Sequence, residues 1–374
     1  MSKKIFFVTG TRADYGKIKS IIKSLEKNFK IYIFVTGMHL MSKYGSTYQI
    51  ISKECKNSKI IKFKNQTGHQ MLDQIISTTI KGISKNLKKI KPDLVVVHGD
   101  RVEAFAAATA ASVNNFLVAH IEGGELSGTI DEHLRHAISK LSHIHLVSNN
   151  EAKRRLALMG EKKNDIFTVG TPDYDIMKSK DLPKIFDVKK RYGIKFDKFA
   201  ISIYHSVTTD LKNLTKYCSI LSKTLIKSNL KYLVIFPNND PGSDIILNSI
   251  LKNFKNNKNF RVIRSMRFEY FLSALKNSSF IIGNSSAGIR EAPFFGIPTI
   301  NIGDRQLNRA KLNSIINLTH DSKKILKAIN LSKDKKFKKT LHFGNGNSSN
   351  KIVKIFSKKR FWMTPIQKKF TSID

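Results

Sequence analysis

Six acidic residues of this 374-residue chain fall within one short stretch. They are Asp100, Glu103, Glu122, Glu125, Asp131 and Glu132. The only basic residue among them is Arg101, so six acids against one base give a local charge of −5 in a chain whose formal net charge is +38. Such a carboxylate cluster in a lysine-rich chain indicates a site, although a buried segment that merely lacks lysine would give the same pattern.

Three of these carboxylates are placed for acid–base chemistry. Asp100 and Glu122 each follow a short apolar run, and Asp131 opens a helical pattern after a glycine-rich loop. Carboxylates held close together raise the pKa of at least one of them, which suits proton transfer. Asp131 could instead only cap its helix, and so could Asp100. We expect Glu125 and Glu132 to be solvated.

Residues suited to binding a diphosphate follow apolar runs in both halves of the chain. Arg12 stands in the sequence TGTR at the predicted start of a helix, where backbone N–H groups favour an anion. Ser285 and Ser286 form a second small-residue turn before a helix, Glu291 follows where it can accept from ribose hydroxyls, and Arg305 ends a later run. An ordinary strand–helix turn is the alternative interpretation for each.

Histidines and a third arginine complete the candidates. His205 ends an apolar run and could be a general acid, a phosphate ligand or a buried structural residue. Arg101 could bind the nucleotide or simply neutralise Asp100. His143 and His145 lie two residues apart, but no third ligand stands at a suitable spacing, so we expect no metal and no cofactor.

Alternating apolar runs and amphipathic stretches must position these residues. Runs that are apolar on both faces, with helical crossovers, favour parallel sheets. We therefore predict an α/β fold of two Rossmann-like doubly wound domains with a cleft between them. The predicted limits are 1–175 for the first domain, 176–355 for the second and 356–374 for a C-terminal tail. The strands are expected near 4–10, 31–37, 94–100, 116–124 and 144–149, then near 199–205, 232–240, 260–265, 280–286 and 297–303.

Composition narrows the function classes. The lysines are scattered rather than gathered with arginine and aromatic residues, so we expect no nucleic-acid partner, while the positive field would attract a small anion. The two cysteines lie far apart, which predicts no disulfide. The N-terminal apolar run is too short for a signal peptide and residues 104–121 are too short to cross a bilayer, so we expect a cytoplasmic protein without a membrane partner.

At these residues the chain resembles the hydrolysing UDP-N-acetylglucosamine 2-epimerases. The resemblance rests on TGTRADYGK, FVTGMHL, PDLVVVHGDR, HIEGGELSGTIDEHLRHAISKLSH, HSVTTD, FPNNDPGS and GNSSAGIREAPFFGIPTINIGDRQ. It implies a fold of glycosyltransferase-B type, a tail that returns to the first domain, and a homodimer or homotetramer. It also implies catalytic roles for Asp100, Glu122 and Asp131. The implied nucleotide-binding residues are Arg12, Arg101, His205, Ser285, Ser286, Glu291 and Arg305.

Serine replaces the family's proline after His205, which removes a rigid φ and leaves the placement of that histidine less determined.

The resemblance implies conversion of UDP-GlcNAc and water to UDP and ManNAc, through elimination to a 2-acetamidoglycal and hydration with inversion at C2. Four alternatives stay open. The same chemistry could act on a UDP- or GDP-linked 2,4-diacetamido-2,4,6-trideoxyhexose of the legionaminic acid branch, or the enzyme could be a non-hydrolysing epimerase. A transferase of this architecture and a nucleotide-sugar sensor without activity are the others.

Overall fold

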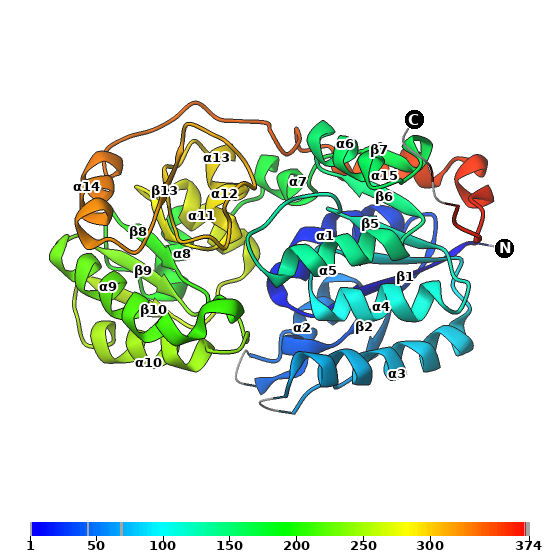
Figure 1. The fold of residues 1–374 in the computed structure, drawn as a ribbon, viewed down its shortest axis with the longest axis horizontal. Helices are drawn as coiled ribbons and strands as arrows, with labels where there is room; N and C mark the ends of the chain where they lie inside the picture. The colour runs from blue at the N-terminus through cyan, green and yellow to red at the C-terminus, as the bar shows by residue number, and fades with distance from the viewer. Residues whose placement is uncertain (1, 43–44, 68–69, 370, 372–374) are drawn as a thin grey trace. The chain divides into compact units, whose positions relative to one another are not determined.

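The computed structural model describes residues 2–42, 45–67, 70–369 and 371. The chain forms two compact α/β units, whose elements are labelled in Figure 1. The first unit comprises residues 1–125, 131–178 and 342–374, and the second comprises residues 126–130 and 179–341.

The first unit contains a seven-stranded parallel sheet in the order β3-β2-β1-β4-β5-β6-β7. In the register, Phe7 of β1 pairs with Ile33 of β2 and with Val96 of β4. The inner strands are short and mostly buried, as parallel strands covered on both faces must be, whereas the edge strands β3 and β7 are only partly buried. The strands are β1 (Lys4–Thr9), β2 (Lys30–Val35), β3 (Lys59–Lys62), β4 (Leu94–His98), β5 (Val118–Ile121), β6 (Ile144–Val147) and β7 (Ile166–Thr168).

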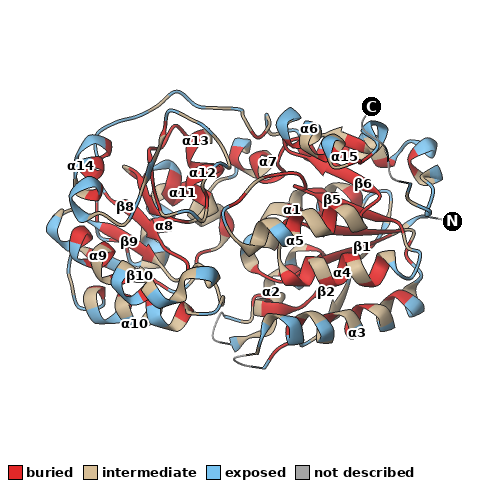
Figure 2. Ribbon diagram, viewed as in Figure 1, coloured by how far each residue is buried: buried red, intermediate tan, exposed pale blue. Residues whose placement is uncertain are grey.

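Helices cover both faces of this sheet because alternate strand residues point to opposite sides. Ile5 and Phe7 pack with α1 and α15, whereas Phe6 and Val8 pack with α3 and α4. Figure 2 shows the resulting buried strands between helices whose outer sides are exposed. The helices are α1 (Arg12–Leu25), α2 (Tyr48–Glu54), α3 (Leu72–Ile90), α4 (Val102–Ser112), α5 (Ile130–Leu141), α6 (Asn150–Leu158), α7 (Asp173–Lys178) and α15 (Ser348–Phe356), with short 3₁₀ turns η1 (Gly37–Leu40), η3 (Lys163–Asp165) and η5 (Lys359–Met363).

The second unit repeats the plan with a six-stranded parallel sheet in the order β10-β9-β8-β11-β12-β13. Its strands are β8 (Ala200–Ile203), β9 (Tyr232–Ile235), β10 (Phe260–Ile263), β11 (Ile281–Gly283), β12 (Thr299–Ile302) and β13 (Ile315–Leu318). Its helices are α8 (Ile185–Tyr192), α9 (Leu214–Lys227), α10 (Ser243–Phe254), α11 (Phe268–Lys276), α12 (Ser286–Ile289), α13 (Glu291–Phe294) and α14 (Ser322–Ser332), with the 3₁₀ turn η4 (Thr208–Asn213). One core of this unit joins β8, β9, β11 and β12 to α9, α10 and α14.

Each sheet reverses its strand order at one point. The reversal lies between β1 and β4 in the first unit and between β8 and β11 in the second. In doubly wound folds, ligands bind outside the carboxyl ends of the strands at such a point. The loops that follow these four strands are therefore the places to look for functional side chains.

The predicted fold class of two parallel-sheet Rossmann-like domains is confirmed. The predicted domain limits and the cleft stay predictions. One assignment differs from the structure: α15, which the sequence placed in the second domain, packs against α1 of the first unit. Across the described parts of the chain, no helix combines the length and the apolar character needed to cross a membrane.

Candidate functional site

A buried imidazole joins the two strand ends at the reversal point of the first sheet. His98 is the last residue of β4, and its Nδ1 lies 2.8 Å from Oδ1 of Asp14 in the first turn of α1. Asp14 also accepts hydrogen bonds from the Thr9 hydroxyl and the Gly10 amide, at 2.7 and 3.1 Å. The imidazole and the carboxylate therefore fix the loops after β1 and β4 against each other.

The other nitrogen of the same imidazole faces a second carboxylate. Nε2 of His98 lies 3.2 Å from Oε2 of Glu122, which follows β5. Burial alone would lower the pKa of His98, but the charges and hydrogen bonds of Glu122 and Asp14 outweigh it and raise that pKa to about 9. The same pairing lowers the pKa of Asp14 against the opposing effect of burial. His98 is thus held as an imidazolium between two carboxylates at neutral pH.

Glu122 is fixed at both its backbone and its side chain. Its exposed fraction is 2%, and its φ of 66° lies in the left-handed region, which costs a residue other than glycine about 1–3 kcal/mol. Its Oε1 accepts a hydrogen bond from the Thr171 hydroxyl at 2.5 Å. Strain of this kind persists where surrounding contacts enforce it, and it is concentrated at functional sites.

A buried guanidinium gathers the remaining acidic residues. Arg135 of α5 is 1% exposed and donates to the Glu122 carbonyl at 3.0 Å, while its Nη2 pairs with the Asp100 carboxylate. Its Nη1 also lies 3.5 Å from Glu125, which accepts from Ser148. Glu125 is 4% exposed, so the expectation that it is solvated is wrong: Arg135 offsets the cost of burying its charge.

The other predicted residues of this unit lie around the same strand ends. Arg12 is the first residue of α1, and Asp131 lies in the first turn of α5, with both side chains partly exposed. Arg101 precedes α4 and donates through Nε to the buried carboxylate of Glu103 at 3.2 Å. This bond orients the guanidinium of Arg101. The sequence alone did not indicate the contact between Arg101 and Glu103.

At the reversal point of the second sheet, His205 is fixed by its neighbours. Its backbone N–H donates to the Asn284 side chain at 2.7 Å, and the same side chain donates to the His205 carbonyl at 2.8 Å. The ring Nδ1 accepts from the backbone N–H of Asn238 at 3.2 Å. An acceptor at Nδ1 leaves the proton of a neutral imidazole on Nε2, where it can be donated to an anion.

The predicted diphosphate residues follow the neighbouring strands of this unit. Ser285 caps α12 by accepting from the Ala287 amide, Ser286 begins that helix, and Glu291 begins α13 with 2% of its surface exposed. Arg305 follows β12 and donates to the Asn284 carbonyl at 3.3 Å. Asn284 therefore links the turn that carries Ser285 to both His205 and Arg305.

Comparison with known proteins identifies the family of the chain. The profile of the UDP-N-acetylglucosamine 2-epimerase family matches residues 23–357. The chain belongs to this family. It is 41% identical to a UDP-N-acetylglucosamine 2-epimerase of Neisseria meningitidis serogroup B, with 100% of each chain covered. It is also 34% identical to a hydrolysing UDP-N,N'-diacetylbacillosamine 2-epimerase of Legionella pneumophila, covering 95% of this chain and 96% of that protein.

A solved structure of this family shares the fold. The UDP-GlcNAc 2-epimerase of Methanocaldococcus jannaschii, crystallised with UDP-GlcNAc and UDP, superposes with a TM-score of 0.79 at 24% identity, covering 95% of this chain and 99% of that one. Membership of this epimerase family makes the chain an enzyme. The roles of the individual site residues stay predictions.

Sequence reasoning missed His98, Asp14, Arg135 and Thr171. His98 and Asp14 stood inside segments that were singled out, yet only the structure shows that they meet, because 84 residues separate them. An arginine four residues after Asp131 puts its guanidinium on the same helix face, and this spacing could have drawn attention to Arg135.

Proposed function

We propose that the chain is a hydrolysing 2-epimerase that converts UDP-GlcNAc and water to UDP and ManNAc in the biosynthesis of a sialic-type sugar acid. The observation that carries the proposal is the set of acidic residues that Arg135 and His98 hold in place. The carboxylate of Asp100 pairs with the buried Arg135, whereas Glu122 accepts from Arg135 through its backbone carbonyl and faces His98 with its carboxylate. Inversion at C2 needs one group to remove a proton and another to return one on the opposite face, so several fixed carboxylates suit it.

In the proposed reaction, a carboxylate removes the C2 proton as the bond from C1 to the UDP oxygen breaks, which leaves a carboxylic acid, a 2-acetamidoglycal and UDP. The C2 proton becomes acidic only as the C1–O bond breaks and positive charge develops on the ring. Arg12, Arg101, Arg305 and the Nε2–H of His205 stabilise the departing diphosphate, since donors fixed where charge develops lower the barrier. Water then adds its hydroxyl group at C1 and gives its proton to a carboxylate, while a carboxylic acid returns a proton to C2.

The same residues support a second substrate. The 34% identical Legionella protein is named for UDP-N,N'-diacetylbacillosamine, a sugar with a second acetamido group. Elimination and hydration at C1 and C2 do not involve C4, so the proposed chemistry applies equally to this sugar. The GDP-linked form of that sugar is the further variant to be tested.

Proton NMR in D₂O tests these alternatives. UDP-GlcNAc and its UDP- and GDP-linked 2,4-diacetamido analogues are each incubated with the enzyme. We expect free nucleoside diphosphate, a free manno-configured sugar and deuterium at C2 from the true substrate. A product still linked to UDP would show a non-hydrolysing epimerase, and tight UDP binding without deuterium at C2 would show a sensor.

A further inference from the structure

A lysine of the C-terminal tail is inserted at the end of α5. The Nζ atom of Lys368 donates to the carbonyls of Ser139, Lys140 and Ser142 at 3.2, 2.8 and 2.7 Å. Ser139 and Lys140 belong to the last turn of α5, and Ser142 follows it directly. One ammonium group therefore binds three carbonyls more than 220 residues away in the sequence.

These contacts meet a general need of helices. The last carbonyls of an α-helix have no partner within the helix, and the helix dipole places partial negative charge there. A cation at this end satisfies both, and lysine side chains commonly do so. Lys368 supplies the cation from outside the helix, so α5 depends on the tail for this stabilisation.

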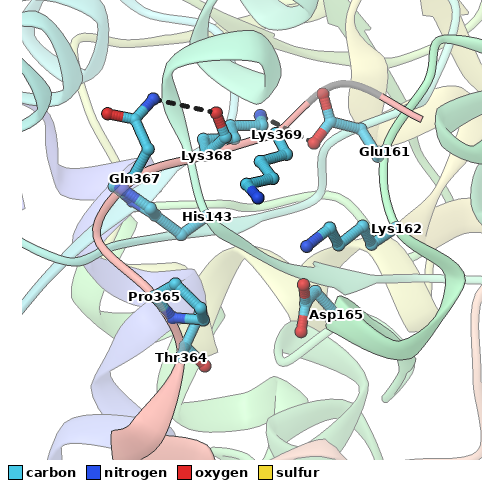
Figure 3. Close-up of a pocket in the computed structure, with 9 residues that line it drawn as sticks. All are labelled: His143, Glu161, Lys162, Asp165, Thr364, Pro365, Gln367, Lys368 and Lys369. Atoms are coloured by element: carbon cyan, nitrogen blue, oxygen red, sulfur yellow. Dashed lines mark hydrogen bonds and ion pairs between the residues drawn. The ribbon is translucent and has the colours of Figure 1, made fainter.

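A buried carboxylate holds the ammonium group in place. Oε2 of Glu161 lies 2.6 Å from Nζ of Lys368 (Figure 3). The same oxygen accepts from Nε2 of His145 at 2.9 Å. Burial alone would raise the pKa of Glu161, but His145 and Lys368 outweigh it and lower that pKa to about 2. His143 donates to the Ile366 carbonyl at 2.9 Å, which ties down the tail just before the lysine.

The contacts of α5 continue from this end toward the candidate site. The Ser139 hydroxyl lies 3.0 Å from Nδ1 of His120, whose Nε2 donates at 2.7 Å to the carbonyl of Gly99, the residue before Asp100. The first half of α5 carries Asp131 and Arg135. We propose that Lys368 is a positioning residue, which fixes the end of α5 and thereby the register of Arg135 and Asp131 against the strand ends. This inference rests on the proposed function of those residues.

Replacing Lys368 with methionine tests the inference. Lys368→Met keeps an unbranched side chain but removes the charge and all donors. We expect kcat for UDP release to fall at least about ten-fold, because small misplacements of catalytic groups cost this much or more. UDP affinity should stay within about two-fold, and amide exchange should rise in residues 136–142. Lys369→Met is the matched control: Lys369 is the next residue, lines the pocket of Figure 3 together with Lys368 and is exposed, so the same charge is lost without these contacts.

The outcomes separate this inference from the proposed function. Absence of UDP release by the unaltered enzyme contradicts the proposed function, whereas amide exchange still reports whether Lys368 holds α5. A wild-type kcat in Lys368→Met, unaltered exchange in residues 136–142, or an equal loss in Lys369→Met would overturn the role of Lys368. If Lys368→Met does not fold, Lys368→Gln, which keeps amide donors without the charge, is judged by the same criteria. Recovery of kcat in Lys368→Arg relative to Lys368→Gln would support a cation at this position.

Discussion

The imidazole of His98 lies between two carboxylates, and this makes the stability of the first unit depend on pH. Its pKa is raised from the ordinary 6.5 to about 9. A group whose pKa is higher in the folded state stabilises fully below its unfolded pKa, and this contribution disappears as pH rises through the folded value. The contribution of His98 is therefore complete below about pH 6.5 and lost by about pH 9.

NMR titration of the imidazole measures this directly. We expect one histidine signal with a midpoint near pH 9, absent in His98→Gln, and a denaturation midpoint that decreases between pH 6.5 and 9 in the unaltered protein. His98→Gln should have a flatter pH profile over that window. A His98 signal that titrates near pH 6.5 would contradict the charged bridge between Asp14 and Glu122.

Asp131 is the carboxylate whose role can be tested against an adjacent control. Asp131→Asn keeps the size and polarity of the side chain but cannot accept or donate the C2 proton. We expect kcat to fall by about 10²–10⁴-fold, the usual contribution of a general acid or base. UDP affinity, measured by calorimetry, should change little. Glu132→Gln removes the neighbouring charge of α5, so a similar loss in that variant would refute a specific role for Asp131.

At the scale of the elements, α15 depends on a carboxylate from another helix. Asp175 of α7 accepts from the backbone N–H groups of Ser348 and Ser349 at 2.7 and 2.6 Å, which satisfies the first turn of α15. Asp175→Ala should cost about 1 kcal/mol, the usual value of a helix N-cap. Amide exchange in residues 348–356 should rise, whereas Asp181→Ala, at an exposed position nearby, should leave it unchanged. Equal protection of α15 in both variants would contradict this capping role.

The sequence predicts the strands and helices that bury continuous apolar runs. β1, β4, β5 and β6 of the first unit and β8, β9, β10, β11 and β12 of the second lie within the predicted ranges, because the burial of most of their residues leaves an apolar signal. β3, β7 and β13 were missed: β3 (KIIK) and β13 (IINL) are only partly buried, and β7 spans three residues. The polar residues 344–351 predict a loop, yet α15 begins within them at Ser348. Its N-terminal contact comes from Asp175, which is distant in the sequence.

The sequence predicted those residues of the candidate site that are marked by their immediate neighbours in the chain. Asp100, Glu122 and Asp131 stand out in the sequence because they follow apolar runs or open a helix. The partners that fix them come from other elements: Arg135 reaches Asp100 across 35 residues, and Thr171 reaches Glu122 across 49. Periodicity carries no information on such pairs. Glu125 was misjudged for the same reason, since its partners Arg135 and Ser148 are visible only in the fold.

At the scale of the whole molecule, the net charge of +38 should influence how the substrate arrives. A positive field attracts an anionic nucleotide over a distance set by salt screening. The Debye length falls from about 20 Å at ~0.02 M ionic strength to about 6 Å at ~0.3 M. We therefore expect kcat/KM to fall several-fold over this range while kcat changes much less, because chemistry in the bound complex is screened little.

Uridine provides the control for this effect. It shares the nucleoside with UDP but lacks the diphosphate charge, so the field of the protein acts only on UDP. Inhibition constants measured across the same salt series should rise for UDP and stay nearly constant for uridine, since screening affects only the charged ligand. Parallel weakening of both inhibitors would show that salt alters the binding residues themselves. A salt-independent UDP constant would mean that the lysines are too dispersed to act on the ligand.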